Sequence, residues 1–296
     1  MNYYKEIKNE LINNEVYKKV KDYSKNRSDL KTYYNVGKLL SEAGKHYGEG
    51  IIKKYSIRLM LELNKKYNER TLRRTRQFYQ FFKEEKWSAL GTELTWSHYR
   101  ELLTLKNMDA IKYYIKISEQ QSLSYRQLRQ RIKNKEYDRL DEDTKLKLKE
   151  YKENEKIDYI KDPILIKNKF DSNEISEKML QQLIMEDIVS FLNELGNGYC
   201  FIKNEFPIKI GDKYNYIDLF LFDITYNRYI VCELKVTELK KDHIGQISTY
   251  MNYVDKRIKT KTQNPTLGII VCKKNNKFVM EFVSNKNILE KEYKLI

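Results

Sequence analysis

The spacing of apolar residues changes near residue 165, and this change constrains the fold of the 296-residue chain more than any other feature. Before it, apolar residues recur every three or four positions, which is typical of one face of a helix. After it, runs of β-branched and aromatic residues alternate with helical segments. The sequence predicts an α+β protein of two domains: an all-α domain over 1–137, a charged linker over 138–165 and an α/β domain over 166–296.

The N-terminal half is expected to contain about six short helices. The stretch "NERTLRRTRQFYQFFKEE" begins with Asn68 as an N-cap, and Thr95 or Ser97 caps a later helix. Short helices joined by short turns predict a helix-turn-helix or winged-helix-like assembly.

The positive charge of the chain is concentrated in this half. Residues 1–150 contain 34 Lys and Arg against 21 Asp and Glu, a balance of +13, whereas residues 151–296 contain 23 against 21, a balance of +2. Such a field favours polyanions, with nucleic acid first and an acidic membrane surface second.

In the C-terminal half we expect one helix over 174–198, ended by Gly196 and Gly198, and then three strands. The strands at 214–223 and 227–236 flank a turn and are predicted to pair in antiparallel fashion. A helix over 243–259 follows. The stretches "TLGIIVCKK" and "FVMEFV" are read as further strands.

Charged residues stand in two of these strands, where side chains usually pack into the core. Asp218 lies in "YIDLFLFD", and Glu233 and Lys235 lie in "YIVCELK" on one face, with Leu234 on the other. Two carboxylates at one end of a strand pair provide the oxygen ligands that Mg²⁺ or Mn²⁺ prefers. A lysine beside them supplies positive charge near a phosphate. The alternative is a solvated strand face.

Two groups of basic residues are candidate phosphate contacts, and a solvated helix face is the alternative. They lie in "RTLRRTR" and "YRQLRQRIKNK". The residues are Arg70, Arg73, Arg74, Arg76, Arg126, Arg129, Arg131 and Lys133.

The ordered motifs resemble a known family along nearly the whole chain. "FLNELGNGYCFIKNEFPIKIG", "YIDLFLFD", "YIVCELK", "IGQISTYMNYVD" and "NPTLGIIVCKK" resemble the PD-(D/E)XK nuclease domain of the YhcG-like bacterial family, with a restriction-endonuclease-like fold. "VGKLLSEAGKHYGEGIIKKYS", "RTLRRTRQFYQFF" and "LTWSHYRELL" resemble the helical, winged-helix-like domain that precedes it.

The resemblance implies a role for each site residue. Asp218 and Glu233 would be metal ligands, Lys235 the catalytic lysine, and Gln246 a residue that steadies substrate or metal-bound water. An acid of the first helix would complete the metal site, with Glu177 as first choice and Glu186 as second. Ile217 stands where the family name has proline.

Together these features predict a metal-dependent DNA endonuclease that uses Mg²⁺ or Mn²⁺ and binds DNA through its basic half. The N-terminal helices are also a candidate homodimer contact. A non-catalytic nucleic-acid-binding scaffold and an RNA-directed nuclease are the alternatives. Because no apolar run approaches about 20 residues and "MNYYKEIKNE" lacks the apolar core of a signal peptide, we expect a cytoplasmic protein with no membrane contact.

Overall fold

A computed structural model describes residues 2–20, 25–63, 67–83, 94–149, 160–170 and 174–296. The chain divides into two compact units, Met1–Tyr137 and Asp138–Ile296. No helix within these described ranges is both long and apolar enough to cross a membrane.

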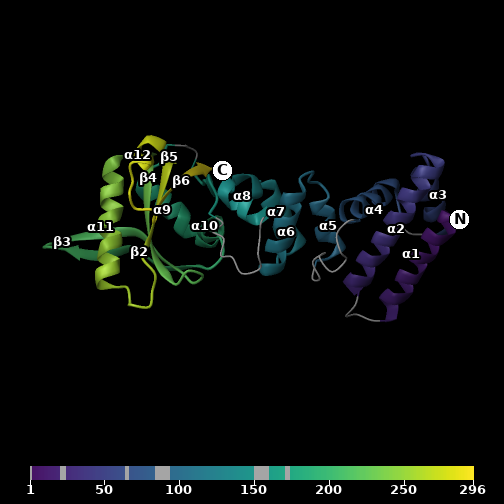
Figure 1. The fold of residues 1–296 in the computed structure, drawn as a ribbon, viewed down its shortest axis with the longest axis horizontal. Coiled ribbons are helices and arrows are strands. Elements are labelled where there is room, and N and C mark those ends of the chain that lie inside the picture. Colours follow the sequence, from purple (N-terminus) through teal and green to yellow (C-terminus); the bar gives the residue numbers. More distant parts are fainter. Residues whose placement is uncertain (1, 21–24, 64–66, 84–93, 150–159, 171–173) are drawn as a thin grey trace. The chain divides into compact units, whose positions relative to one another are not determined.

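The first unit is built from helices (Figure 1). Their bounds are α1 Tyr3–Val20, α2 Lys25–Tyr47, α3 Ile51–Leu63, α4 Glu69–Phe82, α5 Trp96–Leu102, α6 Met108–Gln120 and α7 Tyr125–Lys133. A winged helix needs a β-hairpin, and no strand occurs among the described residues of this unit, so the winged-helix character is not confirmed.

The predicted N-caps are present in the structure. The Asn68 side chain accepts a hydrogen bond from the Thr71 N–H, and Thr95 opens α5 in a capping box with His98. These side chains satisfy amides that the first turn of a helix leaves without partners. The helices pack around a core that includes Ile7, Leu40 and Leu59, each fully buried.

The second unit contains a six-stranded mixed sheet in the order β1-β6-β5-β4-β3-β2. The strands are β1 Ile164–Ile166, β2 Tyr199–Ile210, β3 Lys213–Asp223, β4 Arg228–Glu238, β5 Leu267–Lys274 and β6 Ile288–Leu295. The helical elements are η2 Tyr137–Arg139, which begins at the end of the first unit, α8 Glu142–Lys149, α9 Glu177–Glu186, α10 Ile188–Leu195, α11 Lys241–Arg257 and α12 Lys277–Glu281. As predicted, β3 and β4 pair in antiparallel fashion, whereas β4 and β5 run parallel.

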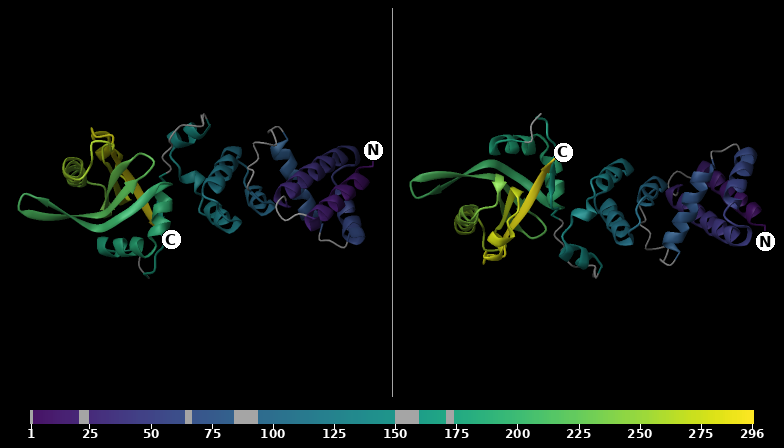
Figure 2. Two further views of the ribbon diagram at one scale, coloured as in Figure 1. Left: turned by 90° about the horizontal axis from the view of Figure 1, so that it is seen from below. Right: turned by 90° about the horizontal axis from the view of Figure 1, so that it is seen from above.

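Both faces of the sheet are covered by helices. On one face, α9 and α10 pack on strand residues such as Leu221 and Leu234. On the other, α11 packs on Val231 and Ile270. Because successive strand residues point to opposite faces, Glu233 lies on the α11 side while Leu234 enters the opposite core. The β2–β3 hairpin extends beyond the rest of the sheet (Figures 1 and 2).

Two predicted elements are wrong. The helix expected over 174–198 is interrupted at Asp187, whose backbone leaves the helical region (φ −133°, ψ 52°) and whose side chain accepts the Ser190 N–H to begin α10. Gly196 ends α10 as predicted. The stretch "FVMEFV" forms α12 rather than a strand, because the Asn276 side chain caps Val279 N.

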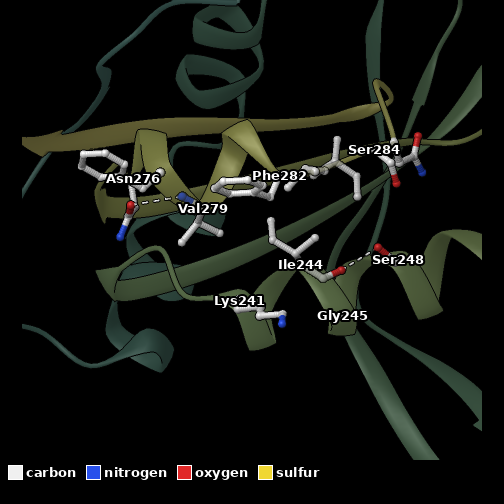
Figure 3. A pocket seen from close by; sticks show the side chains of 12 residues that line it. Lys241, Ile244, Gly245, Ser248, Asn276, Val279, Phe282 and Ser284 are labelled. Carbon is white, nitrogen blue, oxygen red and sulfur yellow. Dashed lines mark hydrogen bonds between the residues drawn. The ribbon is translucent and has the colours of Figure 1, made fainter.

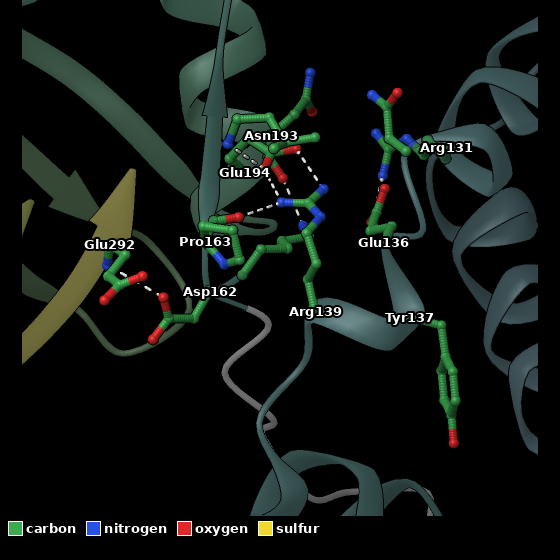
Figure 4. A network of polar contacts seen from close by, with 12 residues as sticks. Arg131, Glu136, Tyr137, Arg139, Asp162, Pro163, Asn193, Glu194 and Glu292 are labelled. Carbon is green, nitrogen blue, oxygen red and sulfur yellow. Dashed lines mark hydrogen bonds and ion pairs between the residues drawn. The ribbon is translucent and has the colours of Figure 1, made fainter. Parts of the chain in front are cut away.

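A buried ion pair ties the first residues of the second unit to α10 (Figure 4). The Arg139 guanidinium pairs with the Glu194 carboxylate and also donates to the Pro163 carbonyl. Glu194 in turn accepts the Leu165 N–H of β1 at 3.0 Å. The segment predicted as a linker therefore contains the helix α8, and one of its residues, Arg139, forms an ion pair with Glu194 of the second unit.

We predict that Gly37→Ala destabilises the first unit by about 1–3 kcal/mol, the usual cost of overpacking. A Cβ at Gly37 would lie 2.3 Å from the Thr75 carbonyl oxygen and 2.7 Å from the Tyr79 Cβ, so α2 and α4 would have to separate. Thermal unfolding followed by circular dichroism checks this. Gly50→Ala is the control, since no atom lies within 4 Å of its added Cβ. Equal melting temperatures for the two variants would contradict the prediction.

Candidate active site

The site begins where β3 separates from β4. Their ladder runs from Asp223↔Arg228 to Leu219↔Cys232 and stops there, with Asp218 and Glu233 next in line. Asp218 Oδ2 accepts the Leu234 N–H at 2.8 Å, and the Asp218 N–H points to Glu233 Oε1 at 3.5 Å. The two carboxylates therefore contact backbone amides across the point where the ladder ends.

Lys235 lies among the acids of this site. Its Nζ is 3.6 Å from Glu233 Oε2 and 3.7 Å from Glu177 Oε2. The Glu233 residue is 1 % exposed and Lys235 is 8 % exposed, whereas the Glu177 side chain, in the first turn of α9, is about half exposed. A buried lysine between acids is held in place by their charge.

Helix α11 contributes the predicted glutamine. Gln246 Nε2 donates to Glu233 Oε2 at 3.0 Å and to the Tyr250 hydroxyl at 3.2 Å. Gln246 therefore faces Glu233, and Tyr250, one turn further along α11, lies beside it. His243 is near Lys235, and its Nδ1 accepts the Lys240 N–H at the start of α11, so it acts as a helix cap.

Burial dominates the electrostatics of the acid pair. It raises the pKa of Glu233 to about 8, with a further contribution from the Asp218 charge that Lys235 partly opposes. Burial also raises the pKa of Asp218, against the Leu234 N–H and Lys235. Near neutral pH the pair therefore retains a proton, which a bound cation would displace.

Two residues near the site were missed by sequence reasoning. Glu205 of β2 lies across from Asp218, between the pairs Asn204↔Leu219 and Phe206↔Ile217, and its φ of +45° is unusual for a glutamate. Its charge adds to those that raise the pKa of Asp218. Gln181 of α9 donates to the Asp218 carbonyl oxygen at 3.1 Å. Neither residue stands in a sequence motif. The positive φ of Glu205 could not be predicted, because a glutamate, unlike a glycine, gives no sign of that conformation.

The first-helix acids differ in their surroundings. Glu177 faces Lys235, while Glu186 pairs with Lys169 at 2.7 Å. Within the described residues, no group of three or more His, Cys, Asp or Glu side chains is arranged to hold a metal. Asp218 and Glu233 are a pair of carboxylates, the hard oxygen donors that Mg²⁺ and Mn²⁺ prefer.

Half of the predicted phosphate contacts are engaged with acids of the first unit. The pairs are Arg73 with Glu69, Arg76 with Glu49, Arg129 with Glu101, and Arg131 with Glu136. Of the others, Arg126 lies beside the Tyr125 ring. Lys133 closes α7.

Arg70 and Arg74 form a different environment. They line a groove on α4 together with Gln77 and the ion-paired Glu69 and Arg73. No ion pair holds either one among the residues that the structure describes. Burial and the charges of Arg70 and of Arg100, a residue not singled out from the sequence, lower the pKa of Arg74. Mutual repulsion among cations is relieved by an anion, so this arginine cluster (Arg70, Arg74 and Arg100) is the strongest anion-binding candidate of the unit.

Comparisons with known proteins confirm the resemblance seen in the sequence. Residues 157–296 match the family described as the YhcG PDDEXK nuclease domain, and residues 8–139 match the DUF1016 N-terminal domain. A curated relative, "Putative nuclease YhcG" of Escherichia coli (strain K12), is 25% identical over an alignment that covers 81% of this chain and 76% of the relative.

Solved structures show more distant likenesses. A repair endonuclease from Pyrococcus abyssi has a TM-score of 0.30 and 19% identity, and covers 42% of this chain. A structure described as an EndoMS-dsDNA2 complex has a TM-score of 0.31 and 15% identity over the same share. The chain spans about half the length of these structures, 49% and 48%. At such scores they add nothing to the family match.

We predict that Glu233→Gln makes the metal-free protein less sensitive to rising pH. A carboxyl whose folded pKa of about 8 exceeds its unfolded pKa costs nothing below the unfolded value. It then lowers the unfolding free energy, by on the order of 1 kcal/mol per pH unit, until the pH passes 8. The glutamine cannot ionise, so the variant gains on the wild type between pH 5 and 8.

Urea unfolding in EDTA across this range provides the measurement. Glu238→Gln, which changes an exposed glutamate of the same strand, is the control and should run parallel to the wild type. Parallel curves for Glu233→Gln as well would show that Glu233 is ionised in the folded protein.

Proposed function

Because the chain resembles the YhcG-like PD-(D/E)XK nucleases along both halves, we propose that it is a metal-dependent endonuclease that hydrolyses phosphodiester bonds of DNA. The observation that carries this proposal is the buried group of Asp218, Glu233 and Lys235 where β3 leaves β4. Burying two acids and a lysine at a strand fork costs free energy, and such groups are found mainly at sites that bind a ligand or substrate.

Asp218 and Glu233 would hold Mg²⁺ or Mn²⁺, with Glu177 as the third acid. The pair fits such an ion, because burial keeps a proton on it that a cation can replace. A bound divalent ion would supply an activated water and neutralise charge on the phosphate. Lys235, held between Glu233 and Glu177, would place its ammonium beside the scissile phosphate.

Gln246 would position the site rather than change charge. Its amide is anchored on Glu233 and Tyr250, so its carbonyl oxygen is left to accept a hydrogen bond from a water or substrate group. Gln181 would support the strand that carries Asp218. Both residues restrict motion of the acids, which chemistry at a fixed phosphate requires.

The arginine cluster supports a DNA-binding role for the first unit. Three cations whose charges repel one another, in a half of the chain with a balance of +13, suit a row of phosphates. The helix-turn-helix or winged-helix-like assembly predicted from the sequence would suit duplex DNA. A dimer contact through the same helices is the other role that the sequence leaves open.

Two alternative functions concern the substrate and the chemistry. An RNA-directed nuclease would use the same acids, because the site contacts phosphate and not sugar. A non-catalytic nucleic-acid-binding scaffold would need none of these acids. The burial of Glu233 beside Lys235 therefore favours a nuclease over a scaffold.

We expect purified protein to nick supercoiled plasmid with Mg²⁺ or Mn²⁺ and not with EDTA. Lys235→Ala and Asp218→Asn should each lower the initial rate by about 100-fold or more, the usual cost of removing a group that stabilises transition-state charge. Lys256→Ala, which changes an exposed lysine in the last turn of α11, is the matched control and should cut like the wild type. Undiminished cutting by Lys235→Ala would exclude this site.

We expect the arginine cluster to set the salt dependence of DNA binding. The triple variant Arg70→Ala, Arg74→Ala, Arg100→Ala should flatten the plot of log K against log salt by about 0.9 per lost phosphate contact. Fluorescence anisotropy with a labelled duplex in EDTA measures it. The control removes three exposed charges from α2 and α3: Lys45→Ala, Lys53→Ala and Lys54→Ala. If both triple variants flatten the plot equally, the effect comes from net charge and not from the arginine cluster.

A further inference from the structure

A groove on the second unit is lined by two exposed aromatic side chains, Phe278 and Phe282; Figure 3 shows the groove from close by, with Phe282 labelled. It has a volume of about 670 Å³ and lies between the first turns of α11 and the segment from α12 to the start of β6. Its lining includes Lys241, Ile244 and Gly245 of α11 and Phe278, Val279 and Phe282 of the other wall.

The exposure of the two phenylalanines is unusual. Phe278 is 81% exposed and Phe282 is 84% exposed, although large aromatic side chains normally supply core burial. Phe278 lies in α12, and Phe282 is the residue that ends this helix. The Asn276 side chain caps the start of α12 and also donates to Glu238 at 3.0 Å, which ties this segment to β4. Both phenylalanine rings line the groove.

The groove shares a helix with the proposed active site. Gly245 lines the groove, and the next residue, Gln246, contacts Glu233. The groove and the proposed site therefore flank the same turns of α11, a helix about 10 Å across, so a strand that passes around α11 would contact both.

The charge around the groove also suits a nucleic-acid strand. The segments 238–245 and 273–286, which contain most of its lining residues, have six lysines against three acids. Of these lysines, Lys241 lines the groove itself, and Lys274 pairs with Glu238 at 3.8 Å. The lysines are Lys240, Lys241, Lys273, Lys274, Lys277 and Lys286, and the acids are Glu238, Asp242 and Glu281. Apolar rings bordered by cations are the combination that binds single strands, with bases on the rings and phosphates on the lysines.

We propose that this groove binds an unpaired nucleobase of the strand that is cut, stacked on Phe278 and Phe282. The inference rests on the proposed nuclease function and deepens it. It assigns the enzyme a substrate with unpaired bases near the scissile phosphate, such as a flap, a gap or a single-stranded end.

The test is binding of fluorescent dT12, rU12 and a blunt duplex in EDTA by anisotropy. The variant Phe278→Ala/Phe282→Ala should bind dT12 at least tenfold more weakly than the wild type, since stacking is lost, and the duplex about equally. Ile224→Ala, an exposed apolar residue in the turn at the other end of β4, is the control and should bind like the wild type.

A second variant separates stacking from general apolar contact. Phe278→Leu/Phe282→Leu keeps an apolar groove without rings and should behave like the alanine variant, whereas Phe278→Tyr/Phe282→Tyr should bind dT12 like the wild type. Photo-crosslinking of 5-iodouracil-substituted dT12 should label the peptide that contains residues 277–286. Full affinity in the leucine variant would overturn the proposal and favour an apolar protein segment as the occupant. Equal loss for the duplex would overturn it as well.

Two further outcomes separate this inference from the nuclease itself. Ring-dependent binding of dT12 by a protein that cuts no substrate with Mg²⁺ or Mn²⁺ would support the base site and overturn the nuclease. Metal-dependent cutting with equal dT12 binding by all variants, and no crosslink at 277–286, would retain the nuclease and overturn the base site. Tighter binding of rU12 than of dT12 supports an unpaired base in the groove and identifies the strand as RNA.

Discussion

The separation of β3 from β4 after the Leu219↔Cys232 pair is the constraint on which the candidate site depends. Where a ladder ends inside a covered sheet, backbone amides lose partners and must be satisfied by side chains. Asp218 accepts the amide of Leu234, and Glu233 faces the amide of Asp218. The strand fork thus explains why two acids are tolerated in a buried position.

The charge balance at that point is incomplete. Two acids and one buried lysine would leave a net negative charge. No second cation pairs with the acids among the described residues; instead, burial and the Asp218 charge raise the pKa of Glu233, so that it holds a proton. Lys235 is shared with Glu177, so it cannot compensate the pair fully. Replacing a buried ion pair by apolar residues of similar volume usually costs a protein little stability or none. The arrangement therefore makes better sense as a cation site than as a structural ion pair.

The strand pair and the Asp218, Glu233 and Lys235 group were predictable because strand alternation and turn signals are local properties of the sequence. The break at Asp187 and the helix at "FVMEFV" were not, because each is decided by one capping side chain, Asp187 and Asn276, against an apolar pattern that suggests otherwise. The arginine cluster could not be recognised from the sequence, because only folding brings Arg100 beside Arg74 and Glu49 beside Arg76. The pair of Arg73 with Glu69, four residues apart on α4, is by contrast visible in the sequence.

Under the proposed function, the distribution of charge would divide nucleic-acid binding between the two units. With a balance of +2, residues 151–296 cannot attract a polyanion strongly, whereas residues 1–150, with +13, can. Electrostatic attraction of this kind is indifferent to base pairing. If the chain discriminates between nucleic-acid structures, the second unit must do so by shape, and exposed rings beside α11 are the feature suited to it, because only an unpaired base offers both of its faces to a phenylalanine.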